Sequence, residues 1–250
     1  MLRLIPVLDL LSGHAVHAVA GNRERYRCVE GVLGDGADPV RLLQAMRQQV
    51  GQDCCYVADL DAILNGQPQW QLIQQLAGAC GRLWLDAGIR SAADLQAVAG
   101  LQRVTPILGT ETVGDLQQVL NSTTADRIIV SLDLRAGRPV FADPAWQSLT
   151  AGQAGERLLE LGVRQVLLLD LQAVGTGRGV PTLELCQELK QRLPELFLIT
   201  GGGVQGPQCV AAAEQAGVDA LLVASVLHQG VLSGSGWRLP AATTPPKEVC

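Results

Sequence analysis

The sequence repeats itself in its two halves, because short apolar runs that end in an aspartate or a glycine recur in the same order. Residues 5–9, 57–60, 85–90 and 107–110 of the first half correspond to residues 129–133, 168–171, 200–204 and 222–225 of the second. The offsets between corresponding residues lie between 111 and 124, a spread that insertions in loops explain. A chain built from two similar halves is expected to place its chemistry where the halves face each other.

Eight β-branched or leucine-rich runs alternate with longer amphipathic segments, which is the pattern of a parallel sheet covered by helices. The expected strands are residues 3–9, 54–60, 82–86, 104–108, 127–133, 165–170, 196–200 and 220–223. The expected helices are residues 39–50, 68–79, 91–99, 112–121, 151–161, 181–192 and 206–216. These units predict an α/β fold, a (β/α)₈ TIM barrel built from two similar half-barrels. A doubly wound open sheet is the alternative, but it does not explain a repeat in two halves.

The composition favours one large domain. Of the 250 residues 48% are apolar and only 17% are charged, which is enough to bury a substantial core. We expect residues 1–231 to form a single barrel and residues 232–250, which are rich in Ser, Gly, Pro and Thr, to form a flexible C-terminal tail.

Charge and hydropathy limit the partners. A net charge of -5 without a basic cluster argues against a nucleic-acid surface. No apolar run is long enough to cross a membrane, and the first strand begins too early for a secretion signal, so a cytoplasmic protein is expected. The seven cysteines lack metal-type spacing, and His14 and His17 lack a third ligand, so neither a metal nor a cofactor is expected.

Aspartates cluster at or just past the ends of the expected strands, where the active face of a barrel lies. They are Asp9, Asp59, Asp61, Asp86, Asp133 and Asp170. A single aspartate there can simply cap the following helix, but six in a chain this poor in charge favour acid–base chemistry. The catalytic candidates are Asp9, Asp133, Asp86 and Asp170.

Glycine-rich turns predict phosphate binding, because the backbone N–H groups of tight turns attract anions and barrels often place such a site after the seventh and eighth strands. The candidates in the second half are Gly202, Gly203, Ala224 and Ser225, and those in the first half are Gly88, Gly109 and Thr110. Two such turns predict an elongated ligand with two phosphates.

Over residues 3–230 the chain resembles the barrel isomerases and cyclases of histidine biosynthesis. The resemblance lies in residues 5–10 with Gly13 and Val16, Tyr26, 38–39, 57–61 with Gly66, 88–91, 109–110, 132–135 with Gly137, Trp146 and 202–204. The Asp-Leu-Asp of residues 59–61 is typical of the isomerase rather than the cyclase.

The resemblance implies an Amadori rearrangement, an aldose–ketose isomerisation of a phosphorylated ribosyl compound. This reaction needs one acid to protonate the ring oxygen and one carboxylate to remove the C2 proton. By resemblance Asp9 is the base, and Asp133 is a supporting acid or binding group. Arg90 is implied to hold phosphate, and Trp146 to stack on the substrate.

The chain departs from the family pattern at the chemistry. Val174 stands where the family has its proton-donating aspartate, and Asp86 replaces a glycine of the first-half phosphate loop. A fixed negative charge within about 5 Å of a phosphate dianion costs binding on the order of 1 kcal/mol unless Arg90 or a proton offsets it. We therefore expect that Asp86 or Asp170 has taken over the role of proton donor and that the substrate has changed.

The sequence therefore predicts a divergent isomerase whose partner is a phosphorylated small molecule. Two alternatives stay open. One is a noncatalytic barrel that binds a phosphorylated ligand or has a regulatory role, and the other is an enzyme of one-carbon or pterin-linked metabolism with a changed substrate.

Overall fold

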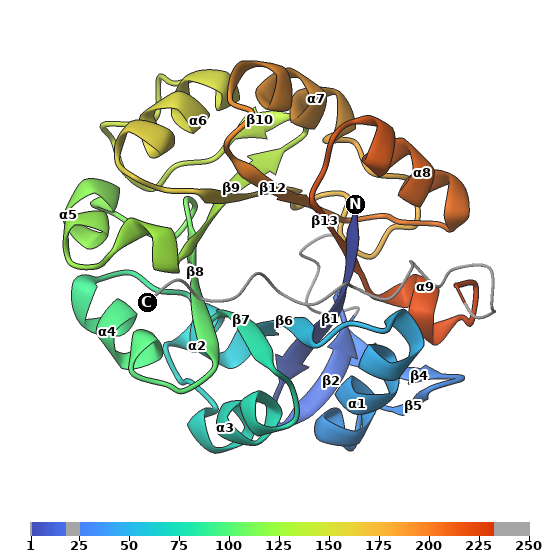
Figure 1. Cartoon of the computed structure of the whole chain (residues 1–250). Coiled ribbons are helices and arrows are strands. Elements are labelled where there is room, and N and C mark those ends of the chain that lie inside the picture. Colours follow the sequence, from blue (N-terminus) through green and yellow to red (C-terminus); the bar gives the residue numbers. More distant parts are fainter. Residues whose placement is uncertain (1, 19–25, 233–250) are drawn as a thin grey trace, which may run out of the picture.

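The computed structural model describes residues 2–18 and 26–232, and its centre is a closed ring of eight parallel strands (Figure 1). The ring consists of β1 (Arg3–Leu11), β6 (Cys54–Asp59), β7 (Arg82–Asp86), β8 (Val104–Gly109), β9 (Ile129–Arg135), β11 (Gln165–Asp170), β12 (Phe197–Thr200) and β13 (Ala220–Val223). Each strand pairs with the next, and β13 returns to pair with β1. The prediction of a (β/α)₈ barrel is confirmed, and the open sheet is excluded because the ring closes. Except for Leu232, the tail expected at 232–250 lies outside the described residues.

Helices follow the strands, and most of them lie on the outside of the ring (Figure 1). They are α1 (Pro39–Val50), α2 (Leu60–Asn65), α3 (Trp70–Gly78), α4 (Ala92–Ala99), α5 (Leu116–Asn121), α6 (Ala151–Glu160), α7 (Leu183–Arg192), α8 (Pro207–Gln215) and α9 (Ser225–His228), with a 3₁₀ turn at Ala125–Arg127. Helix α5 begins four residues later than the sequence predicts, because the Asp115 side chain accepts a hydrogen bond from the Gln118 N–H and caps the helix there. Helix α2 was not expected, and the next section gives the reason for it.

Short strands lie outside the ring: β2 (His14–His17) and β3 (Arg27–Cys28) extend it from β1, β10 (Arg138–Pro139) adds to β9, and β4 (Glu30–Gly31) and β5 (Gly34–Asp35) form a separate two-stranded sheet. Strand β2 forms a hairpin with β1 and pairs with β3. The turn between β1 and β2 has positive φ at Ser12 and at Gly13, as a tight hairpin turn requires. The hairpin extends β1 past the aspartate that the sequence placed at its end.

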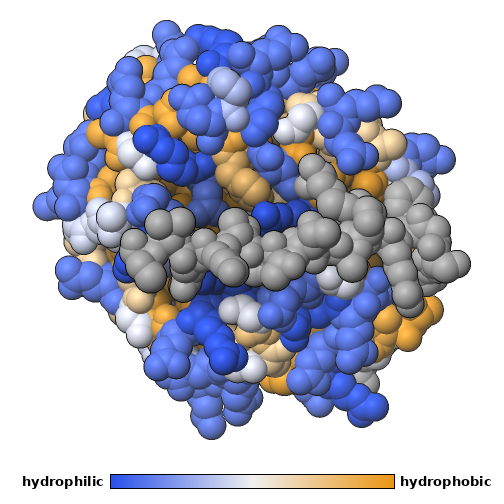
Figure 2. Space-filling view, viewed as in Figure 1, coloured by the Kyte–Doolittle hydropathy of each residue, from blue (hydrophilic) through white to orange (hydrophobic). Residues whose placement is uncertain are grey.

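The core has two layers because successive strand residues point to opposite sides of the sheet. One cluster fills the barrel interior and includes Ile5, Tyr56, Trp84, Ile107, Ile129, Leu167, Ile199 and Leu222. A larger cluster packs the outer strand faces against the helices. Figure 2 shows one face of the molecule, on which hydrophilic side chains cover most of the outer ring. Among the described residues no helix has the length and apolar character needed to cross a membrane.

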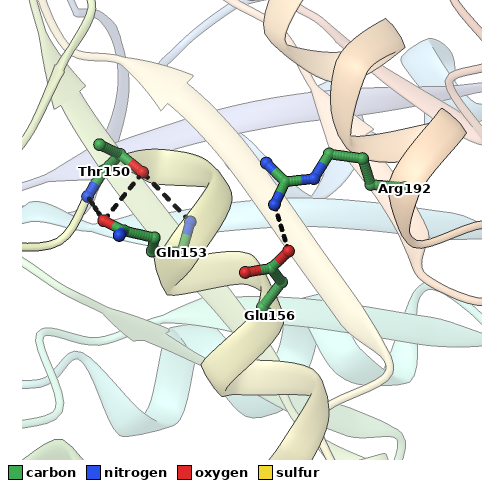
Figure 3. Close-up of polar contacts among 4 residues, drawn as sticks. All are labelled: Thr150, Gln153, Glu156 and Arg192. Atoms are coloured by element: carbon green, nitrogen blue, oxygen red, sulfur yellow. Dashed lines mark hydrogen bonds and ion pairs between the residues drawn. The ribbon is translucent and has the colours of Figure 1, made fainter.

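Local sequence fixes the helix ends, as α6 illustrates (Figure 3). The Thr150 hydroxyl oxygen accepts from the Gln153 N–H at 3.3 Å, and the Gln153 side chain accepts from the Thr150 N–H at 2.9 Å. This reciprocal pair satisfies two N–H groups at the helix start. One turn later Glu156 forms an ion pair with Arg192 of α7, which links neighbouring outer helices.

Candidate active site

A cavity of about 300 Å³ opens where β1, β11, β12 and β13 end. Its lining includes Asp9, His17, Val174, Gly203, Ser225 and His228. The catalytic candidate Asp9 and the second-half glycine turn therefore share one enclosure. The C-terminal ends of the strands are the face on which barrel enzymes carry their active sites.

Asp9 is the carboxyl group of this cavity. It lies near the end of β1, in register with Val16 of the hairpin and with Ala58 of β6. Burial raises its pKa from the ordinary 3.8 to about 7, the backbone N–H of Ala18 lowers it, and the nearby charge of Asp86 raises it further. A carboxyl group with a pKa near 7 can accept or release a proton at neutral pH, as general acid–base catalysis requires.

Two further carboxyl groups with raised pKa values lie at the ends of β7 and β9. Burial raises the pKa of Asp133 to about 8, although the Ser131 hydroxyl donates to its Oδ1 at 2.6 Å. Burial raises the pKa of Asp86 to about 6, partly offset by the Gly88 N–H and by a hydrogen bond from Tyr56. Neither carboxyl group is among the residues that line the cavity, whereas Tyr56 is. Tyr56 thus connects the cavity to Asp86.

Asp170 and Asp59 instead accept hydrogen bonds from backbone N–H groups. Asp170 is 4% exposed and accepts from the N–H groups of Gly137 and Gln172 at 2.8 and 3.0 Å. It does not line the cavity. Asp59 is fully buried and caps α2 by accepting from the Ala62 N–H, which is why a helix begins directly after β6.

The second-half turn has backbone N–H groups without an acceptor among the described residues. Gly202 and Gly203 have φ of +84° and +80°, and they line the cavity together with Ala224 and Ser225. Within residues 2–18 and 26–232, the N–H groups of Gly202 and Gly203 donate to no other group. The four second-half residues predicted from the sequence are therefore brought together beside Asp9.

The first-half turn shares one feature with the second, a glycine with positive φ at a close backbone approach, but Ala87 lacks the positive φ of Gly202. Gly88 has φ of +61°, and a Cβ there would lie 2.6 Å from the Ile63 Cα; at Gly203 a Cβ would lie 2.3 Å from the Gly179 carbonyl oxygen. Only glycine fits such close backbone approaches at positive φ. The repeat in the sequence therefore reappears in the requirement for glycine at 88 and 203, but not in the whole turn.

The remaining first-half candidates do not line the cavity, and they bond to the protein itself. The Arg90 guanidinium donates to the carbonyl oxygens of Gly88 and Ile63. Gly109 and Thr110 lie beside Asp133, and the Thr110 hydroxyl accepts from the Asp133 N–H at 3.0 Å. Their role in phosphate binding stays a prediction.

Trp146 lies away from the cavity. It has no exposed surface, and it packs against Phe141 with ring centroids 6.0 Å apart. The Arg157 guanidinium lies 4.4 Å from the centre of its ring. Stacking of Trp146 on a substrate stays a prediction that this packing does not support.

Two histidines and a tyrosine of the cavity were missed as site residues. His17 and His228 meet edge to face with ring centroids 5.3 Å apart. Burial lowers the pKa of His17, and burial together with the charge of His17 lowers that of His228 to about 4. Tyr56 could have been found from strand alternation, which points it into the barrel. His17 and His228 lie in β2 and α9, more than 200 residues apart in the sequence, so no local sequence pattern could predict their contact.

Val174 lines the cavity with an apolar side chain, at the position where the resemblance expected the proton donor. Nowhere in residues 2–18 and 26–232 do three His, Cys, Asp or Glu side chains gather closely enough to hold a metal ion. A proton donor in this site therefore has to come from the carboxyl groups around Tyr56 or from the cavity's own histidines.

Comparisons with known proteins agree with this geometry. The family described as "Histidine biosynthesis protein" matches residues 3–233. An uncharacterised protein of Methanocaldococcus jannaschii is 28% identical over 92% of this chain and 95% of its own. The 1-(5-phosphoribosyl)-5-((5-phosphoribosylamino)methylideneamino) imidazole-4-carboxamide isomerase of Thermus thermophilus is 32% identical over 95% of this chain and 100% of its own, and that of Rubrobacter xylanophilus is 34% identical over 91% of each.

Proposed function

The chain belongs to the histidine biosynthesis protein family, and from that premise we propose that it is an isomerase that rearranges a phosphorylated ribosyl compound by acid–base chemistry. One observation carries the proposal. The Asp9 carboxyl group, with a pKa of about 7, shares a cavity with the open N–H groups of the Gly202–Gly203 turn. A proton-transfer group thus stands next to a site suited to the phosphate of a small molecule.

The reaction would be an aldose–ketose rearrangement of a ribosylamine. A carboxylic acid protonates the ring oxygen, the C1–O bond breaks, and the nitrogen lone pair forms a C1=N bond. Asp9 then removes the proton from C2, and the C–H electron pair forms C1=C2 while the C=N electrons return to nitrogen. Transfer of the hydroxyl proton at C2 to C1 gives the aminoketose. Atoms and electrons balance without an external oxidant or cofactor, as the expected absence of a cofactor requires.

We assign the acid to Asp133, which acts electrostatically on Tyr56 but does not line the cavity, so its proton would have to cross the cavity wall at Tyr56. At neutral pH a carboxyl group with a pKa of about 8 still holds its proton, whereas Asp86, with a pKa of about 6, is mostly ionised. Asp86 then orients Tyr56 at the cavity wall by accepting its hydrogen bond. Asp170 is left out of the proposal because it does not line the cavity and, unlike Asp133, is not among the carboxyl groups that act on Tyr56. The substrates are small metabolites, and a cytoplasmic setting is part of the proposal.

Val174 favours a second candidate, a noncatalytic barrel that binds a phosphorylated ligand. An apolar side chain at the cavity wall cannot deliver a proton, and loss of that step alone would leave a binding protein. An enzyme of one-carbon or pterin-linked metabolism would instead keep Asp9 in use on another phosphorylated substrate.

Turnover of ribosylamines separates these candidates. The panel contains the compound isomerised by the Thermus enzyme and N-aryl 5-phosphoribosylamines with a single phosphate, with ketose formation as the readout. We expect turnover of at least one compound, and Asp9→Asn should lower it by about 10²–10⁴-fold. Asp126→Asn, a change at an exposed aspartate outside the cavity, is the matched control. Phosphate binding without turnover of any compound would favour the binding protein or the changed substrate.

A further inference from the structure

We infer that the site holds a ligand with one phosphate, bound at the second-half turn, because the first-half turn is closed by the chain's own carboxyl groups. This inference rests on the proposed function, since it takes the second-half turn as the phosphate site. It narrows the substrate to a phosphomonoester and replaces the expectation of a ligand with two phosphates.

Three N–H groups in the first-half turns after β7 and β8 already have acceptors. The Gly88 N–H donates to Asp86 Oδ1 at 3.0 Å, and the Glu111 N–H donates to Asp133 Oδ2 at 3.3 Å. The Thr110 N–H donates to the Ser131 carbonyl oxygen at 2.9 Å. A phosphate at this turn would have to displace these bonds before it could form its own.

The arginine of this turn is also engaged. One Arg90 nitrogen donates to the Gly88 carbonyl oxygen at 2.9 Å, and the other donates to the Ile63 carbonyl oxygen at 2.6 Å. Both bonds hold the guanidinium against the outer side of the turn, and Arg90 does not line the cavity. The positive charge is therefore used to brace the turn.

The charge near the first-half turn is negative. The charge of Glu111 raises the pKa of both Asp86 and Asp133, and the charge of Arg90 lowers the pKa of Asp86. Asp133 holds its proton at neutral pH, so a phosphate dianion brought to Gly88 would be repelled by the charges of Asp86 and Glu111, against which Arg90 supplies a single positive charge. The first-half turn is thus less suited to an anion than the second-half turn, whose N–H groups have no acceptor among the described residues.

The cavity also ends before the first-half turn. Tyr56 stands in its wall and bonds to Asp86, while Gly88, Gly109 and Thr110 are absent from the lining. With about 300 Å³ of space, the ligand reaches from the Gly203 turn to Asp9 and meets the Tyr56 wall there. Its far end is a group without phosphate.

Amide chemical shifts test the inference on the whole chain. We would titrate ¹⁵N-labelled protein with inorganic phosphate and follow the backbone amides of Gly202, Gly203, Gly88 and Gly109. We expect saturable shifts at Gly202 and Gly203 only. Saturable shifts at Gly88 or Gly109 of similar midpoint would overturn the single-phosphate inference and leave the proposed function standing. Shifts at none of the four would remove the phosphate site of the proposed function itself.

Replacing the closing carboxyl group gives the converse test. Asp86→Gly removes the acceptor of the Gly88 N–H, and the Gly88 amide should then shift with phosphate. If it stays unshifted in a folded variant, occupation by Asp86 is not what closes the turn, and the inference fails.

If Asp86→Gly does not fold, the affinities of the unaltered protein for ligands with one and with two phosphates test the inference. We would measure binding of ribulose 5-phosphate and ribulose 1,5-bisphosphate by calorimetry. We expect the second phosphate to improve the dissociation constant by less than threefold. An improvement of tenfold or more would show a second phosphate site and overturn the inference.

Discussion

The carboxyl group of Asp133 should make the protein less stable as the pH rises, and Asp133→Asn should remove that effect. Folding raises the pKa of Asp133 from 3.8 to about 8, chiefly because the side chain is buried with 4% exposure. Between those two pH values the unfolded chain has lost a proton that the folded chain keeps. The free energy of unfolding therefore falls as the pH rises, and it levels off above pH 8.

The size of the effect follows from proton linkage. Each pH unit between the two pKa values costs about 1.4 kcal/mol, so the loss from pH 5.5 to 8.5 is about 3 kcal/mol for this one group. The asparagine has no charge to bury and should not lose this amount. It keeps the acceptor for the Ser131 hydroxyl but puts an amide opposite the Glu111 N–H, a fixed cost of about 1 kcal/mol at every pH.

Urea unfolding at pH 5.5, 7 and 8.5 measures the difference. We expect the stability of Asp133→Asn relative to the unaltered protein to improve by about 3 kcal/mol from the lowest to the highest pH, which corresponds to roughly 6–12 °C in Tm. Asp126→Asn, which changes an exposed aspartate, is the control for general effects of charge. If the relative stability of Asp133→Asn changes by less than about 0.5 kcal/mol over this range, the burial of an ionisable Asp133 is refuted.

Three further outcomes are expected. Turnover of a ribosylamine substrate should rise through about pH 7 as Asp9 ionises and fall through about pH 8 as Asp133 loses its proton; a rate profile that is flat from pH 6 to 9 contradicts these roles. Gly203→Ala should cost at least about 2 kcal/mol more than Gly13→Ala in urea unfolding, since both glycines have φ near +80° but only the Cβ at Gly203 meets a backbone oxygen, at 2.3 Å; equal costs would show that the close approach is absent. Thr150→Ala should cost about 1 kcal/mol by removing the cap of α6, and no loss of stability would mean that water replaces the cap.

The fold could be predicted because the alternation of strands and helices in a barrel gives the sequence a regular hydrophobic pattern. Apolar strand runs alternate with amphipathic helical segments, and most of the expected helices begin and end within two residues of their expected bounds. The hairpin strands β2 to β5 are too short and too polar to show a strand pattern. Asp59 shows the limit at the site, because its position after a strand cannot tell a helix cap from a catalytic group. The hydrogen bonds that Asp59 accepts from the Ala62 N–H and from the backbone and side chain of Gln69 distinguish the two.

The three-dimensional contacts also decide how the two halves differ in use. Gly88 and Gly203 both have positive φ, which sequence repetition could reveal, but the Gly88 N–H donates to the side chain of Asp86 two residues earlier, whereas the Gly203 N–H has no acceptor among the described residues. In the first half the N–H groups are held by carboxyl groups, and in the second half they face the cavity that contains Asp9. A ligand with a single phosphate then has one favourable direction, with its anionic end at Gly203 and its reacting carbons toward Asp9. A change in the first half alone is thus sufficient for a barrel with a two-fold repeat to bind its substrate in a single orientation.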